Sequence, residues 1–125
     1  MDEVVLAAAA RARSDPSSCA VVLVEGMSDQ AAVQTLAERA GRDLRAEGIF
    51  VVPMGGATNI GHFVDLFGPA GFGVRLTGLC DLGEELFFRH GLAQVGPYFV
   101  CVADLEDEMI RALPENDLAR RTMEE

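Results

Sequence analysis

The chain has 125 residues, 50% of them hydrophobic, which is enough for one compact domain and too few for two ordinary ones. Its formal net charge of -10 argues against a general nucleic-acid binder, because non-specific affinity comes mainly from basic residues that neutralise phosphates. All ten basic residues are Arg, so a lysine nucleophile, a Schiff base and a P-loop lysine are excluded.

The cysteines and the N-terminal segment indicate in which cellular compartment the protein resides. Cys19, Cys80 and Cys101 are odd in number, widely spaced and set in or beside apolar runs, which predicts reduced core residues. The N-terminal segment opens acidic, unlike a secretory signal, and no stretch approaches the roughly 20 apolar residues of a membrane span. We therefore expect a cytoplasmic protein that does not enter a membrane.

Helical and strand-like segments alternate along the chain. The predicted strands, all short apolar runs, are 20–24, 49–52, 74–80 and 98–103. The first predicted helix is an Ala-rich segment at 4–13, and the second is capped by Ser28 and ended by Gly41. The other predicted helices are 60–67, 84–90 and 105–113. Such alternation predicts an α/β fold with about four parallel strands sandwiched between helices and joined by right-handed crossovers.

The boundaries follow from the same pattern. Residues 1–18 are expected to form a leading helix and linker, and residues 19–113 the α/β domain. Pro114 ends the last predicted helix, and residues 114–125 form a polar tail.

Acidic residues follow three of the four predicted strands. The candidate metal ligands are Glu25 and Asp29 after the first strand, Asp81, Glu84 and Glu85 after the third, and Asp104 and Glu106 after the fourth. The carboxyl ends of parallel strands share one edge, so these groups should converge. Two carboxylates 4 Å apart repel by roughly 4 kcal/mol in a surface-like dielectric. A hard divalent cation, Mg²⁺ or Mn²⁺, would offset that repulsion.

Structural roles compete with this interpretation. Asp29 suits the first turn of a helix, where the helix dipole favours an acidic residue, and Asp81 and Asp104 suit helix N-caps. Glu25 has no such explanation, because it stands between four apolar residues and a glycine. Glu106 lies nearer the strand end than the acidic residues after it, which makes it the best ligand of the last helix.

The second strand ends differently, in a glycine turn that reads GGATN. Backbone amides around Gly55, Gly56, Thr58 and Asn59 are candidates to hold a phosphate. The turn lacks the lysine and the spacing of a P-loop, and a plain turn is the alternative.

Four segments together resemble a TOPRIM domain: VEG with Asp29, GGATNI, CDLGEE and ADLEDEMIRAL. The resemblance spans residues 20–113 and is greatest to the TOPRIM domain of the overcoming-lysogenization-defect (OLD) nucleases. TOPRIM domains also occur in topoisomerases, bacterial primases and recombination-repair proteins. The resemblance implies a Rossmann-like fold and magnesium-dependent making or breaking of phosphodiester bonds.

The resemblance also implies roles for particular residues. Glu25 matches a metal ligand or general acid/base and Asp81 a metal ligand, while Asp29 and Glu106 match further ligands of the nuclease branch. The family's Asp-x-Asp pair is altered, because Gly83 stands at its second position, and Glu84 or Glu85 would have to compensate.

Two basic groups of the family are also missing. Ala57 replaces the basic residue of the glycine turn. A lysine beyond the fourth strand is absent as well, and Arg111 supplies charge there without a lysine's proton chemistry.

Two functions follow from these patterns. One is nucleic-acid phosphodiester hydrolysis or nucleotidyl transfer, with weak binding of nucleic acid by the domain alone. The other is a noncatalytic metal- or nucleotide-binding module that acts as a subunit of a basic partner protein or as a homodimer. The altered Asp-x-Asp pair and the missing lysine favour the second, whereas Glu25 and Glu106 favour the first. A receiver-like signalling domain fits less well, because its acidic pair follows the first strand and it carries a lysine near the end.

Overall fold

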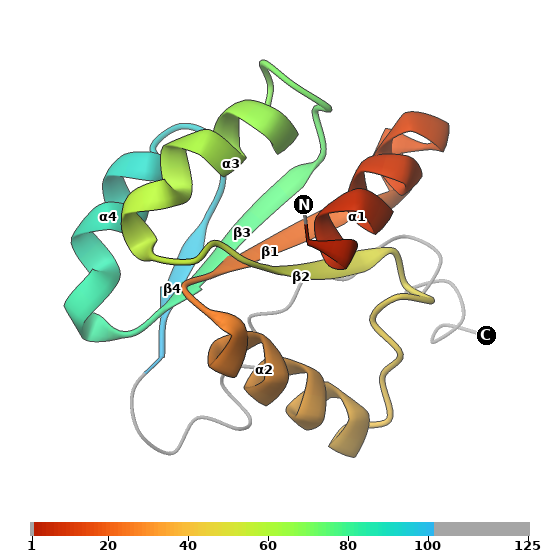
Figure 1. Cartoon of the computed structure of the whole chain (residues 1–125), viewed down its shortest axis with the longest axis horizontal. Helices are drawn as coiled ribbons and strands as arrows, with labels where there is room; N and C mark the ends of the chain where they lie inside the picture. The colour runs from red at the N-terminus through yellow and green to blue at the C-terminus, as the bar shows by residue number, and fades with distance from the viewer. Residues whose placement is uncertain (1, 102–125) are drawn as a thin grey trace.

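A four-stranded, all-parallel sheet organises residues 2–101, the range that the computed structural model describes (Figure 1). The strands are β1 (Ala20–Val24), β2 (Ile49–Pro53), β3 (Arg75–Cys80) and β4 (Tyr98–Val100). The helices are α1 (Glu3–Ser14), α2 (Met27–Arg39), α3 (Ile60–Phe67) and α4 (Glu85–Gly91). Short 3₁₀ turns lie at Pro16–Ser18, Ala57–Asn59 and Leu82–Glu84. These elements confirm the predicted α/β fold.

The strand order is β2-β1-β3-β4, so the chain reverses its direction across the sheet at β1. In register, Ala20 of β1 lies beside Ile49 of β2 on one side and Arg75 of β3 on the other. Right-handed crossovers then place α2 on one face and α3 and α4 on the opposite face, as Figure 1 shows. Such a reversal opens a crevice at the carboxyl ends of β1 and β3, where open α/β sheets bind ligands.

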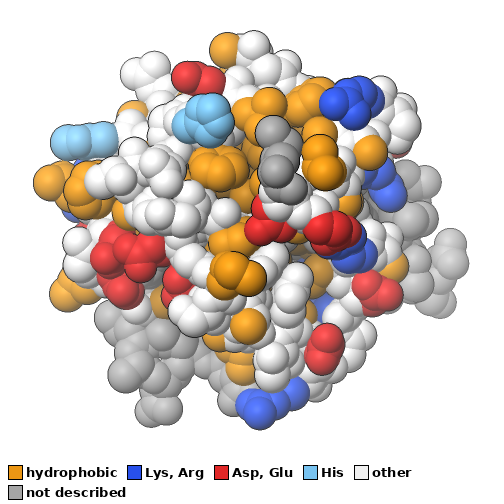
Figure 2. Space-filling model, in the orientation of Figure 1, with side chains coloured by type: hydrophobic (Ala, Val, Ile, Leu, Met, Phe, Trp, Pro, Cys, Tyr) orange, Lys and Arg blue, Asp and Glu red, His pale blue; other side chains and the backbone are white. Residues whose placement is uncertain are grey.

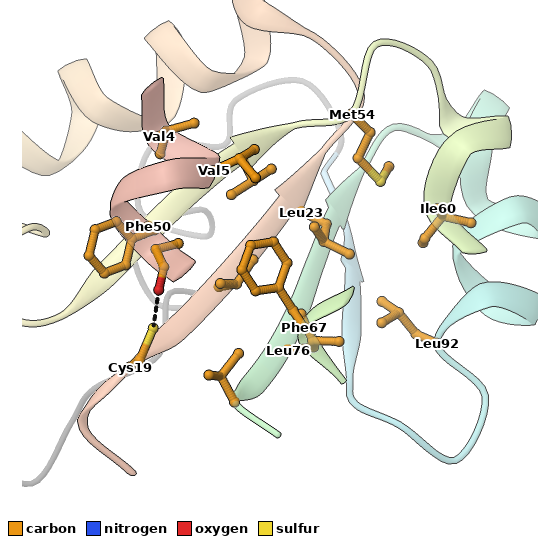
Figure 3. Close-up of a cluster of buried hydrophobic side chains, with 14 of the residues drawn as sticks. Val4, Val5, Cys19, Leu23, Phe50, Met54, Ile60, Phe67, Leu76 and Leu92 are labelled. Carbon is orange, nitrogen blue, oxygen red and sulfur yellow. Dashed lines mark hydrogen bonds between the residues drawn. The ribbon is translucent and has the colours of Figure 1, made fainter. Parts of the chain in front are cut away.

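The larger hydrophobic core lies between the sheet and the three helices α1, α3 and α4. Leu23, Phe67 and Leu92 are among its fully buried side chains and point toward one another in Figure 3. Helix α1 contributes four buried residues to this core, so the leading helix is packed against the sheet. The smaller core lies under α2, where Val33 and Ala37 contact the opposite face of β1 and β2. Strand β1 is therefore buried on both faces, as its continuous apolar run predicts.

The three cysteines form no disulfide. Cys19 and Cys80 are buried, which agrees with the prediction, whereas Cys101 is half-buried. The Cys19 thiol faces the Ala8 carbonyl oxygen at 3.8 Å (Figure 3), and burial raises its pKa to about 11. A thiol with such a pKa stays protonated at neutral pH and behaves as a core residue.

The prediction that Ser28 caps α2 is wrong. The helix begins at Met27 and its N-cap is Gly26, while the Asp29 carboxylate reaches back to accept a hydrogen bond from the Gly26 N–H at 3.0 Å. Ser28 thus falls inside the first turn, where its hydroxyl cannot play the N-cap role. Helix α4 begins at Glu85, one residue later than predicted, because Glu84 belongs to a 3₁₀ turn. The last predicted strand begins at Tyr98 as expected, and β4 ends at Val100. Residues 102 and 103 of that predicted strand, the last predicted helix and the tail lie outside the described residues.

None of the helices within residues 2–101 has the length and apolar content needed to span a membrane.

Gly78→Ala is expected to lower the free energy of unfolding by about 1–3 kcal/mol, because the core is already closely packed there. A Cβ atom on Gly78 would lie 2.5 Å from a ring carbon of Phe88 and 2.7 Å from a methyl group of Leu92, both fully buried. Urea denaturation measures the change. Gly61→Ala on α3 is the control, since no atom lies within 4 Å of its added Cβ, and it should stabilise the helix slightly. Equal stability of the two variants would contradict the packing argument.

Candidate functional site

A pocket of about 200 Å³ opens at the carboxyl ends of β1 and β3, at the reversal of strand order. Its lining comprises Val24, Glu25, Asp29, Val33, Leu79, Cys80, Asp81, Glu84 and Cys101. Four of the predicted metal ligands therefore border one pocket: Glu25, Asp29, Asp81 and Glu84. Figure 2 shows acidic side chains gathered over the start of α4, on the same side of the molecule.

Glu25 stands directly after β1 and is half-buried. Its backbone carbonyl accepts a hydrogen bond from the Gly56 N–H at 3.0 Å, and the Met54 N–H donates to the preceding Val24 carbonyl at 2.9 Å. These two bonds fix the backbone of Glu25 against the glycine turn. The side chain takes no part in these two bonds, and Glu25 lines the pocket.

Asp29 has a structural role in the first turn of α2, which is the alternative to metal binding that the sequence suggests. One of its carboxylate oxygens accepts from the Gly26 N–H, which satisfies a donor at the start of α2. A carboxylate has two oxygens with about four lone-pair sites, so this bond leaves acceptor capacity on the pocket side.

Asp81 likewise caps a turn. Its Oδ1 accepts from the Glu84 N–H at 3.2 Å, and its backbone carbonyl accepts from the same N–H at 3.2 Å. The side chain is exposed at the pocket rim. The Asp81 carboxylate can cap the turn and bind an ion at the same time, because one hydrogen bond leaves acceptor capacity on its two oxygens.

Glu85 does not line the pocket, although the sequence offered it as a ligand beside Glu84. Its Oε2 accepts from the Tyr98 hydroxyl at 3.0 Å and from Arg89 Nη2 at 3.1 Å. Arg89 Nε also donates to the Tyr98 hydroxyl at 3.2 Å. These contacts raise the pKa of Arg89, through Tyr98 first and Glu85 second.

The glycine turn adopts a conformation that favours glycine at two positions. Gly55 has φ of 73° and Gly56 has φ of 130°, both in the region that side chains rarely allow. The Asn59 amide donates to the Met54 carbonyl at 2.9 Å and to the Gly55 carbonyl at 3.3 Å. The Gly56 N–H is thus already bonded to the Glu25 carbonyl, and the Asn59 amide is bonded to carbonyls of the turn. Thr58 is exposed. A phosphate role for these four residues stays a prediction.

Two cysteines border the acidic pocket, which the sequence interpretation missed. The Cys101 N–H donates to the Cys80 carbonyl at 2.7 Å, so the chain after β4 remains paired with β3. Burial, and then the neighbouring Cys101, Glu85 and Asp81, raise the pKa of Cys80 to about 12. Cys80 is therefore protonated at neutral pH in the metal-free protein. The sequence carried a signal for Cys101, because this residue stands shortly before the candidate ligand Asp104.

Carboxylate oxygens are the ligands that magnesium and manganese prefer, so the donor chemistry of the pocket suits a hard divalent ion. Within residues 2–101, however, no group of three or more His, Cys, Asp or Glu is arranged to hold a metal ion. The predicted ligands Asp104 and Glu106 lie outside the described residues.

A family model described as "Overcoming lysogenization defect protein-like, TOPRIM domain" matches residues 18–82. The match runs from the residue before Cys19 to the turn that Asp81 caps, and so includes β1, β2, β3 and two of the pocket carboxylate segments. No curated protein and no solved structure gives a significant match to the chain.

Proposed function

Because the chain belongs to the OLD-like TOPRIM domains, we propose that it hydrolyses phosphodiester bonds of nucleic acid with the help of Mg²⁺ or Mn²⁺. Membership in this family supports a metal-binding function related to nucleic acid in general. The observation that carries the finer proposal is the pocket at the strand-order reversal, which Glu25 and Asp81, each at the end of a neighbouring strand, both line.

In this proposal Asp81 and Asp29 hold the ion together with Glu25, and Asp104 and Glu106 are further candidate ligands. A divalent ion held there would supply positive charge to the phosphate and lower the pKa of a bound water molecule. Glu25 accepts a proton from the water that attacks phosphorus. The bond from phosphorus to the leaving oxygen breaks, and that oxygen takes up a proton from solvent water. The net charge of -10 leaves the domain few basic groups to hold the substrate.

A second function has its own support. Gly83 supplies no side chain and the chain has no lysine. These features favour a noncatalytic module that binds a metal or nucleotide and docks on a basic partner or on a second copy. Nucleotidyl transfer is the other reaction compatible with the same pocket. The module and the enzyme differ in one measurable respect, which is strand cleavage.

Magnesium or manganese at about 100 times its dissociation constant is expected to stabilise the fold by about 2.7 kcal/mol, because the ion binds the folded pocket and hardly binds the unfolded chain. Thermal melts with and without metal measure this gain. A melting temperature that does not move at millimolar metal would remove the metal site and the hydrolytic function that depends on it.

Asp81→Asn tests whether the gain comes from this pocket. Asn retains an oxygen that can cap the turn at Leu82–Glu84, but it deletes one charge. The variant should be more stable than the wild type without metal, because repulsion with Glu25 is relieved, and should lose most of the metal-induced gain. Asp65→Asn is the control, since Asp65 is exposed on α3 and does not line the pocket. It should retain the full gain.

A further inference from the structure

The two edges of the sheet differ, and the edge at β2 is largely blocked. Alternate residues of β2 bond to β1, so Ile49, Val51 and Pro53 direct their backbone groups to the open side. The Ile49 N–H donates to the Leu44 carbonyl at 2.8 Å, and the Gln30 side-chain amide donates to the Val51 carbonyl at 2.9 Å. Pro53 has no N–H to offer. A further strand therefore finds few free groups at this edge.

Strand β4 forms the other edge of the sheet (Figure 1). The Gly78 N–H of β3 donates to the Pro97 carbonyl at 3.0 Å, so Pro97 and the alternate residues after it bond to β3. Tyr98 and Val100 direct their N–H and C=O groups to the open side instead. Within residues 2–101, no backbone group pairs with that side of β4. This edge can accept another strand.

Side chains on both faces of β4 border the open edge. On the face that α2 covers further along the sheet, Phe99 lies beside Leu79 and is 43% exposed. On the opposite face, the Tyr98 hydroxyl donates to Glu85 of α4 at 3.0 Å and accepts from Arg89 of α4 at 3.2 Å. The edge is therefore bordered by an exposed aromatic ring and by one charge of each sign.

These features complement themselves about a two-fold axis through Phe99, as an isologous contact requires. When a second copy pairs antiparallel, Tyr98 lies opposite Val100 of the second copy and the two exchange both N–H···O bonds, while the two Phe99 rings meet. Because α4 connects β3 to β4, the two α4 helices lie roughly two strand spacings apart, about 10 Å, a usual distance for packed helices. They run antiparallel, which brings Glu85 toward Arg89 of the second copy.

We propose that this protein forms a two-fold symmetric homodimer in which two β4 strands pair antiparallel and join the two sheets into one. A second copy suits the edge because the same short patch supplies the backbone groups, the aromatic ring and both charges that the opposite side needs. The proposal does not depend on the proposed reaction, since Tyr98, Phe99 and Val100 do not line the acidic pocket, and neither do Glu85 and Arg89.

Analytical ultracentrifugation of the full chain measures the association. The contact is smaller than a standard interface, so we expect a dissociation constant in the micromolar range, roughly 1–100 µM. Above that concentration the protein should sediment with twice the 13.4 kDa mass of one chain. A wild type that still sediments as a 13.4 kDa monomer at about 500 µM would overturn the proposal.

Phe99→Glu tests the axis, because it places two carboxylates opposite each other. It should raise the dissociation constant of the dimer at least about tenfold. Phe87→Glu is the matched control: Phe87 is 46% exposed on α4, but it lies two residues from Glu85 and so on the other side of the helix. It should leave the dissociation constant unchanged. If Phe87→Glu weakens the dimer and Phe99→Glu does not, another surface mediates the association and the assignment to β4 is wrong.

Two further changes test the strand pairing and the helix contact separately. Val100→Pro removes an outward N–H, which an edge strand tolerates, so the chain should stay folded in thermal melts and lose the dimer. A folded variant that still dimerises would refute the strand pairing. Arg89→Glu should weaken the dimer, and adding Glu85→Arg should restore it, because the two charges are then exchanged. Failure of the double exchange to restore the affinity would refute the two-fold arrangement.

Discussion

Glu25→Gln is expected to lower metal-dependent cleavage of nucleic acid by roughly 10²- to 10⁴-fold, the range that a general acid or base contributes. Glu25 is half-buried at the pocket, and only its backbone takes part in the hydrogen bond that holds the glycine turn. Gln keeps the size of the side chain and cannot accept the proton. The melting temperature without metal should therefore stay within a few degrees of the wild type while activity falls.

Nicking of supercoiled plasmid and cleavage of single strands, each with Mg²⁺ and with Mn²⁺, measure this effect. Asp65→Asn serves as the matched control, because it deletes one charge away from the pocket and should cleave like the wild type. Equal cleavage by wild type and Glu25→Gln would point to a contaminating nuclease or to another site. No cleavage by the wild type, together with metal-induced stabilisation, would leave the noncatalytic module as the function.

Phe88→Ala should produce the largest stability change, a loss of about 3–5 kcal/mol in the free energy of unfolding. The ring is fully buried between α4 and the sheet, and it lies against Gly78 so closely that β3 cannot carry a side chain there. Its removal leaves a cavity that the surrounding strand cannot fill, because the backbone of β3 is paired on both sides.

Phe87→Ala is the matched control for the core variant. Phe87 is the neighbouring residue on α4 and is 46% exposed, so its truncation should change stability by less than about 1 kcal/mol. Urea denaturation of both variants gives the comparison, with the slope of the transition as a check that both unfold cooperatively. Similar losses in the two variants would mean that α4 does not pack through the face described.

Much of the fold was predictable because the sheet is parallel and helices cover both of its faces. The run at Ala20–Val24 is apolar throughout, since helices cover both of its faces, and its predicted bounds are confirmed. Helix α3 is also confirmed at both ends, because Gly68 and Pro69 follow its apolar face directly. The resemblance to a TOPRIM domain, drawn from four short motifs, is confirmed by the family match.

Local capping was less predictable. The sequence favoured Ser28 as the cap of α2, but the helix starts at Met27 and Asp29 reaches back to Gly26. Which residue caps a helix depends on the backbone angles at its first residue, and composition does not fix them. The same limit applied after β3, where a 3₁₀ turn at Leu82–Glu84 delays α4 by one residue.

The sequence predicted that the candidate site lies at the carboxyl ends of the strands, but it did not separate the candidate ligands from one another. The rule that carboxyl ends of parallel strands meet brought Glu25 and Asp81 to one pocket, as expected. The rule could not tell Glu84 from Glu85. That difference depends on Tyr98, which is distant in sequence and reaches Glu85 only after β4 has joined the sheet.

The strand order has a consequence for how the chain folds. β1 is the first strand to be synthesised, yet both of its neighbours come later: Ala20 pairs with Ile49 and with Arg75, and neither pair is closed by a hairpin. No local turn can nucleate such a sheet, so its loop-closure entropy must be overcome before any strand pairing forms. On the ribosome, β1 would keep one edge unpaired until Cys80 has emerged. An apolar strand with an open edge is a template for aggregation, and early docking of α1 and α2 onto β1 would shield its faces during that interval.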